Sequence, residues 1–175
     1  MEQKYRNITD PTRIYFISRI VAVIITVSFF VLSFSNSAAA QSVDFKIKGV
    51  GIGTSYQMVL GRLGEPLTNT KSGTNPCGGK RRMIHYSGLT IKFDEDESKQ
   101  NIVIFIEVTS PKWEISPGIS VGSSLRTVRT KFGRPNELLK RSGFDTVTYL
   151  DGDGAVTFYF RNKKLVKATR DLNLC

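Results

Sequence analysis

Two stretches of the sequence, IGTSYQMVLGRLGEP at residues 52–66 and VGSSLRTVRTKFGRP at residues 121–135, align without a gap at a constant offset of 69 residues. Near the start of each stretch, Ser55 or Ser124 offers a hydroxyl that can accept a hydrogen bond from a free amide of a first helical turn. Near its end, a glycine can adopt the positive φ that stops a last turn, and the proline two residues later prevents the helix from continuing. These glycines are Gly64 and Gly133. The sequence therefore predicts one short helix in each copy of an internal repeat.

Strand-like runs follow each predicted helix. In the first copy, Leu89, Ile91 and Phe93 are apolar and alternate with polar residues, which is typical of a strand with one buried face. The strands expected after the first helix are residues 83–87, 89–93 and 102–108, and those expected after the second are residues 146–150, 156–160 and 165–171. A short lead-in strand is also expected before each helix, at residues 45–50 and 113–116.

The expected fold class is α+β, because helices and antiparallel strands are both present and no parallel crossover is indicated. It consists of two tandem repeats, each a helix followed by an antiparallel meander of three to four strands. The predicted boundaries are residues 1–40 for a signal peptide, 41–116 for the first repeat and 117–175 for the second.

The first forty residues are typical of a secretory signal peptide. Four basic and two acidic residues lie within residues 1–19, and fifteen largely apolar residues follow at 20–34. That apolar run is shorter than the roughly 20 residues that a membrane-spanning helix needs. Residues 35–40 end in Ala-Ala-Ala, which fits the pattern that signal peptidase recognises, so cleavage is expected after Ala40. The alternative is an uncleaved signal anchor, and in both cases a periplasmic or secreted location is expected.

The chain that remains after Ala40 is basic. From Gln41 onward there are 21 Lys and Arg residues against 13 Asp and Glu residues, a formal charge of +8, which favours anionic partners or surfaces. The two cysteines, Cys77 and Cys175, form an even set. Because cysteines tend to pair in oxidising compartments, one disulfide is expected between them. The alternative is a free catalytic thiol.

The motif shared by both copies resembles a family of small envelope domains. It consists of Gly-Thr-Ser or Gly-Ser-Ser, a helix with valine at its middle, Leu-Gly-x-Pro or Phe-Gly-x-Pro, a tyrosine, a turn, and a strand with Thr and Phe. This pattern resembles the outer-membrane assembly lipoproteins of the SmpA/OmlA type, and two such units in one exported chain resemble the β-lactamase inhibitory protein fold. The resemblance implies that the strands of both repeats join into one curved sheet with the helices on one face. The chain departs from these families in having no lipid-attachment cysteine after its apolar run and cysteines for one disulfide only.

Enzymatic chemistry has little support in the sequence, because it contains none of the common catalytic or metal-binding motifs. His85 is the only histidine and lies in a predicted strand. The acidic clusters at residues 94–97 and 151–154 lack the spacing of a calcium loop and are expected to be turns. The one tight basic cluster is expected on a loop as a candidate anion-binding site, and its members are Lys80, Arg81 and Arg82. No metal or cofactor is expected.

Residues 102–106, Ile-Val-Ile-Phe-Ile, are apolar on both faces of a predicted strand. Helices of one repeat can cover only one face, so the other face is either packed inside the core or exposed for a partner. In the second case the outward side chains would form a concave protein-binding face with aromatic anchors. Its expected members are Thr90, Lys92, Phe105, Trp113 and Tyr159.

The function expected from these features is that of a non-enzymatic protein-binding module of the bacterial envelope, which as an inhibitor would act by occlusion. One alternative is an envelope component that binds anionic lipid or peptidoglycan through its positive charge, in a manner that salt weakens. An alternative of another class is an enzyme that uses His85 or Cys77. Nucleic acid is not an expected partner, because the chain is exported and lacks the aromatic residues interleaved with basic ones that single-strand binders carry.

Overall fold

The computed structural model describes residues 43–74, 78–141, 143–152 and 154–172, all of which belong to the unit Gln41–Cys175. The first half contains helix α2 (Tyr56–Leu63) and strands β1 (Thr68–Thr74), β2 (Lys80–Tyr86), β3 (Leu89–Glu95) and β4 (Asn101–Val108). The second half contains helix α3 (Leu125–Phe132) and strands β5 (Glu137–Arg141), β6 (Phe144–Asp151), β7 (Gly154–Arg161) and β8 (Lys164–Leu172). The predicted signal peptide and the predicted disulfide between Cys77 and Cys175 lie outside the described residues.

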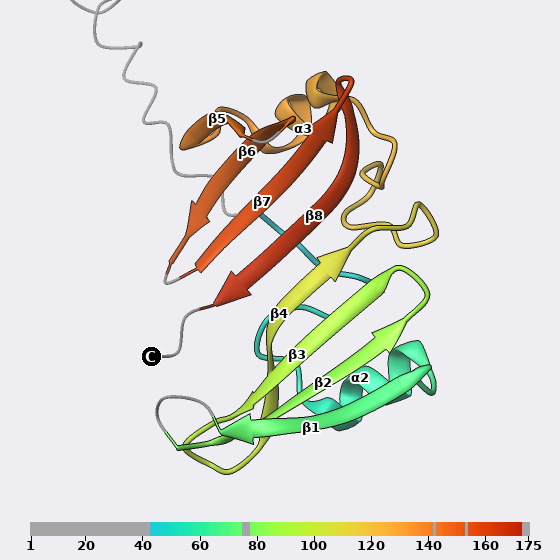
Figure 1. Ribbon diagram of the computed structural model, residues 1–175, viewed down its shortest axis with the longest axis vertical. Helices are drawn as coiled ribbons and strands as arrows, with labels where there is room; N and C mark the ends of the chain where they lie inside the picture. Colours follow the sequence, from blue (N-terminus) through green and yellow to red (C-terminus); the bar gives the residue numbers. More distant parts are fainter. Residues whose placement is uncertain (1–42, 75–77, 142, 153, 173–175) are drawn as a thin grey trace, which may run out of the picture. The chain divides into compact units, whose positions relative to one another are not determined.

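The strands form one antiparallel, eight-stranded sheet in the order β1-β2-β3-β4-β8-β7-β6-β5 (Figure 1). The two halves of the sheet meet at β4 and β8, where residues 105–108 pair with residues 168–171. The α+β fold class with a mainly antiparallel sheet and two helices is thus confirmed. The interpretation of the two halves as copies of one repeated unit stays a prediction.

Both helices begin and end where the sequence predicts. The side-chain oxygen of Ser55 accepts a hydrogen bond from the amide three residues later, and Ser124 does the same for α3. Gly64 ends α2 with φ +81° and Gly133 ends α3 with φ +75°, in a region that residues with a Cβ rarely adopt. Within the described ranges, no helix is long and apolar enough to cross a bilayer.

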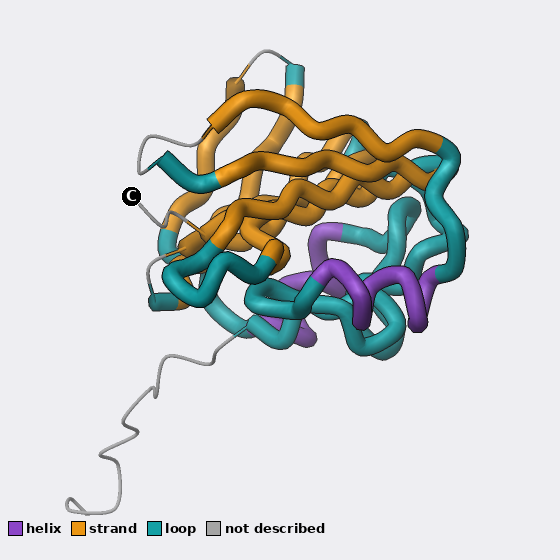
Figure 2. Tube along the Cα trace, turned by 90° about the horizontal axis from the view of Figure 1, so that it is seen from below, coloured by secondary structure: helices purple, strands orange, loops and turns teal. Residues whose placement is uncertain are grey.

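The two helices lie on the same face of the sheet, together with connecting loops (Figure 2). They direct Val59, Val128 and Phe132 into the core. Along the strands, buried residues alternate with half-buried or exposed ones, most clearly in β7. We call the opposite face, which no described helix covers, the open face.

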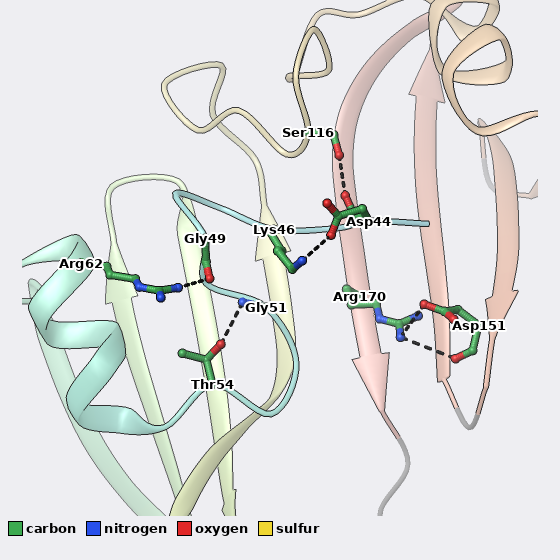
Figure 3. A network of polar contacts seen from close by, with 9 residues as sticks. All are labelled: Asp44, Lys46, Gly49, Gly51, Thr54, Arg62, Ser116, Asp151 and Arg170. Atoms are coloured by element: carbon green, nitrogen blue, oxygen red, sulfur yellow. Dashed lines mark hydrogen bonds and ion pairs between the residues drawn. The ribbon is translucent and has the colours of Figure 1, made fainter. Parts of the chain in front are cut away.

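The fourth strand of each half differs from the prediction. The lead-in segments before the helices, residues 43–50 and 113–119, each contain only an isolated bridge instead of a strand. They contact each other, since the Ser116 hydroxyl donates a hydrogen bond to the carbonyl oxygen of Asp44 (Figure 3). The additional strands are β1 and β5, which follow the helices and lie where the sequence predicts no strand.

A tyrosine ties the end of each helix to the sheet. Tyr86 Oη donates a hydrogen bond to the carbonyl oxygen of Gly64 at 2.8 Å, and Tyr149 Oη donates one to the carbonyl oxygen of Gly133 at 3.1 Å. Burial raises the pKa of both phenols above the ordinary value. For Tyr86 the nearby Glu65 carboxylate raises the pKa further, which is the expected effect of a like charge.

These tyrosines predict a loss of stability at alkaline pH. A raised pKa in the folded state means that their contribution is complete below the unfolded pKa of about 10 and is lost as pH rises through the folded pKa. Changing Tyr86 and Tyr149 to Phe should lower the free energy of unfolding at neutral pH by about 1 kcal/mol for each lost hydrogen bond. Urea unfolding across a pH series should then show a weaker alkaline loss in the double variant, and an unchanged alkaline profile would contradict this origin.

Candidate protein-binding face

A row of polar side chains crosses the open face. From each strand to its neighbour in the sheet, one residue of the row pairs directly with the next. Directly paired residues lie on the same face of a sheet. Across the sheet from β1 to β5 they are Thr68, His85, Thr90, Glu107, Thr169, Thr157, Thr148 and Glu137. We call these residues the threonine row. His85 Nδ1 lies 3.0 Å from Thr90 Oγ1, and Thr148 Oγ1 lies 3.3 Å from Thr157 Oγ1, so these two pairs of neighbours in the row are hydrogen bonded.

Three aromatic rings lie beside this row, each beneath a cation. The cation-to-centroid distances are 4.5 Å for Lys92 over Phe105, 4.3 Å for Lys167 over Tyr159 and 4.5 Å for Arg161 over Phe144. All three rings are half-buried. The rings of Phe144 and Tyr159 also meet edge to face, with centroids 6.5 Å apart. The open face therefore combines apolar surface with positive charges that stand above it.

A hollow of about 350 Å³ lies on the open face between β2, β3, β4 and β8. Arg81, Lys92 and Phe105 line it, together with the carboxylates of Asp94 and Asp171. The Nε of Arg81 lies 3.1 Å from Oδ1 of Asp94, whose side chain is only 4% exposed. Charges of both signs therefore surround this hollow, and part of them are already paired within the chain.

The structure places most of the predicted binding residues on the open face, but not all of them. Those on the open face are Thr90, Lys92, Phe105 and Tyr159. Trp113 lies in the core instead and is 4% exposed. Its ring meets Tyr86 at 5.8 Å between centroids, and its Nε1 donates a hydrogen bond to the carbonyl oxygen of Ser87 at 2.8 Å. The contribution of the four open-face residues to binding stays a prediction.

The predicted basic cluster begins strand β2 instead of lying on a loop. Because successive strand residues point to opposite faces, Arg81 and Arg82 diverge. Arg81 pairs with Asp94, as described above, whereas Arg82 Nη1 donates a hydrogen bond to Asn69 Oδ1 at 3.2 Å. The guanidinium of Arg82 also lies 4.3 Å from the ring centroid of Tyr56. The structure does not bring these side chains together with Lys80 into one anion site.

Sequence reasoning missed four residues of the open face, which come from β4, β6, β7 and β8. Phe144, Arg161 and Lys167 belong to it, and so does Glu107, whose Oε2 lies 3.7 Å from Lys167 Nζ. The alternate polar residues of β8, Lys167, Thr169 and Asp171, are a visible signal for Lys167 only. Within the described residues, no group of three or more His, Cys, Asp or Glu residues is arranged to hold a metal ion.

Comparisons with known proteins show similarity in structure but not in sequence. No protein-family model and no curated protein sequence matches the chain. A cysteine-rich secretory protein from Staphylococcus aureus is similar at TM-score 0.50 and 12% identity, over 77% of this chain and 49% of that one. An extracellular protein containing a SCP domain from Bacillus anthracis has TM-score 0.46 and 17% identity, over 79% of this chain and 48% of that one.

A candidate beta-lactamase inhibitor protein from Streptococcus mutans has TM-score 0.29 and 14% identity, over 73% of this chain and 90% of that one. The similarity to the Staphylococcus aureus structure is one of fold alone. The chain spans about half the length of the Staphylococcus aureus and Bacillus anthracis structures that it matches.

Proposed function

We propose that the open face binds another protein outside the cytoplasm and that the chain has no chemistry of its own. The observation that supports this function is the set of three half-buried aromatic rings on a sheet face without a covering helix. Aromatic and arginine side chains are enriched where proteins bind one another, and an apolar patch on an outer surface often marks such a site. The two halves, which we interpret as tandem repeats, would then contribute a meander each to one binding face.

The chemistry of the open face indicates the kind of partner. Lys92, Arg161 and Lys167 each stand over one of the rings, so a partner meets positive charge together with apolar surface. The surface that fits best carries carboxylates next to apolar side chains. When such a partner is an enzyme, the protein would inhibit it by covering its active site. Export of the chain, which the N-terminal sequence predicts, agrees with the description of the Staphylococcus aureus protein as secretory.

Tyr159→Ala should weaken partner binding strongly. Loss of a central aromatic anchor at an interface costs about 2 kcal/mol or more, which corresponds to roughly a 30-fold higher Kd. The measurement uses the purified chain as bait in envelope extract, followed by titration of the captured partner against each variant. Tyr159→Phe keeps the ring and should retain most of the affinity.

The matched control is Leu67→Ala, which removes an apolar side chain that is 74% exposed and lies outside the rings of the open face. It should leave the Kd unchanged. Equal weakening by Leu67→Ala and Tyr159→Ala would contradict the assignment of the open face. Complete loss of capture at moderate salt would also contradict it, because screening weakens charge pairs but not apolar contact.

A further inference from the structure

A second surface, on the helix-bearing side, concentrates positive charge around a hollow. The hollow is about 700 Å³ in volume and lies beside α3. Its basic lining residues come from three places: the exposed side of α3, the loop that follows it and the turn between β7 and β8. They are Arg126, Arg129, Arg134 and Lys163. A volume of this size is typical of pockets for small ligands.

The positive charge of this hollow is not neutralised within the described part of the chain. None of the four cations takes part in an ion pair there, and all four are exposed. The one carboxylate in the lining is Asp145, which leaves three formal positive charges in excess. Four cations that surround one concave surface repel each other, so their arrangement favours an anion between them.

The first turn of α3 adds to this potential. The amino end of a helix carries partial positive charge, and acidic residues are the ones that stabilise it. The first turn of α3 contains no acidic residue, and Arg126 stands at its second position. This placement is unfavourable for the helix by itself. It is favourable for a bound anion, which would interact with the arginine and with the helix dipole at once.

Helix α2 shows that the fold does not require these cations. The positions 69 residues before Arg126, Arg129 and Arg134 are not basic. They are occupied by Gln57, Leu60 and Glu65. The arginine that α2 does have, Arg62, donates a hydrogen bond to the carbonyl oxygen of Gly49 (Figure 3). Residues 117–175 hold 11 Lys and Arg against five Asp and Glu, while residues 41–116 hold ten against eight. The excess charge is therefore a property of the second half.

We infer that the hollow beside α3 binds a phosphate group of a small soluble phosphorylated ligand. A phosphate monoester carries close to two negative charges and three acceptor oxygens, whereas a carboxylate carries one charge. Planar guanidinium groups bind such oxygens in pairs, and three of the four cations are arginines. The concave shape favours a ligand that enters over a flat membrane surface. This site is on the opposite side of the sheet from the open face, so it does not rest on the proposed protein-binding function.

The test is calorimetric titration of the full chain with inorganic pyrophosphate. We compare the natural sequence with the double variant Arg126→Gln, Arg129→Gln. Because each charge-assisted arginine contact is worth about a tenfold change in affinity or more, the double variant should raise the Kd by roughly 100-fold. The matched control Lys71→Gln, Lys112→Gln removes two exposed cations away from the hollow and should raise the Kd by less than about threefold. Thermal unfolding of all variants verifies that they fold.

Three results would overturn the inference. The first is equal weakening by the two double variants, which would assign binding to general charge. The second is the absence of heat from pyrophosphate with the natural sequence. The third is binding to phosphatidylglycerol vesicles that pyrophosphate does not compete away, because the ligand would then be a membrane surface. The site is supported if pyrophosphate displaces the vesicles from the natural sequence but not from the double variant Arg126→Gln, Arg129→Gln.

Discussion

Phe158→Ala is expected to lower the free energy of unfolding by about 3 to 5 kcal/mol, the range for deleting a fully buried aromatic side chain. Phe158 is 0% exposed and lies at the centre of the second half. Its ring stacks on Phe132 of α3 at 5.4 Å between centroids and meets Tyr149 of β6 at 6.0 Å. Its centroid also lies 6.5 Å from that of Phe45, in the lead-in segment before α2. One ring thus joins a helix, a strand and the lead-in segment, and its loss leaves a cavity between all three.

The measurement is urea unfolding of the variant against Tyr159→Ala, the adjacent residue, which points to the open face. Tyr159→Ala should lower the free energy of unfolding by much less. Surface substitutions change it by about 0.5 kcal/mol, and the half-buried Tyr159 ring contributes only part of what a fully buried ring contributes. If Phe158→Ala does not fold, Phe158→Leu keeps most of the volume and should cost about 1.5 kcal/mol or less. Equal losses at positions 158 and 159 would contradict the assignment of buried and open faces.

The helices could be predicted because the residues that begin and end them act on nearby backbone groups. Ser55 accepts a hydrogen bond from the amide of Met58, and the amide of Gly64 donates one to the carbonyl oxygen of Leu60, so neither residue needs a tertiary contact to set the helix boundary. The alternating strand β3 could be predicted for a similar reason, since its period of two is visible in any short window.

The edge strands could not be predicted in the same way. β1 has the sequence TNTKSGT, and all of its residues whose exposure is described are exposed. Its strand conformation comes from backbone hydrogen bonds to β2, which a hydrophobic pattern does not report. β5, with the sequence ELLKR at the other edge, depends on β6 in the same manner.

The candidate site was only partly visible for a related reason. The sequence shows a polar residue at every second position of several strands, but not which of them become neighbours. The threonine row depends on the pairing of Glu107 with Thr169, which joins β4 to β8 across 61 intervening residues. Trp113 shows the opposite error: the sequence predicts it in a lead-in strand and on the binding face, whereas it is buried and its indole N–H donates a hydrogen bond to a carbonyl oxygen inside the core.

Asp151→Ala is expected to lower the free energy of unfolding by about 3 kcal/mol, because it leaves a buried guanidinium without its carboxylate. Arg170 Nη2 lies 3.0 Å from Asp151 Oδ2, and the Arg170 side chain is 10% exposed (Figure 3). Its neighbours across the sheet, Ile106 and Val156, are both 0% exposed. Among the described residues Nη1 of Arg170 has no hydrogen-bond partner, so the carboxylate is the main compensation for burying this charge. The Asp151 side chain is 29% exposed, which keeps the expected loss at the lower end of the range for buried pairs.

The opposite substitution, Arg170→Met, should change stability by less than about 1 kcal/mol or raise it, because an apolar side chain of similar length suits this core position and removes the cost of burying a charge. Asp151→Ala should then cost less than about 1 kcal/mol in the Arg170→Met background, since no unpaired charge remains. Urea unfolding of the four proteins gives this double-mutant cycle. If Asp151→Ala costs the same in both backgrounds, the carboxylate acts through the turn between β6 and β7 and not through Arg170. Together with an unchanged or raised stability of Arg170→Met, a coupling of about 2 kcal/mol or more would instead show that the ion pair offsets the cost of burying Arg170 without adding to net stability.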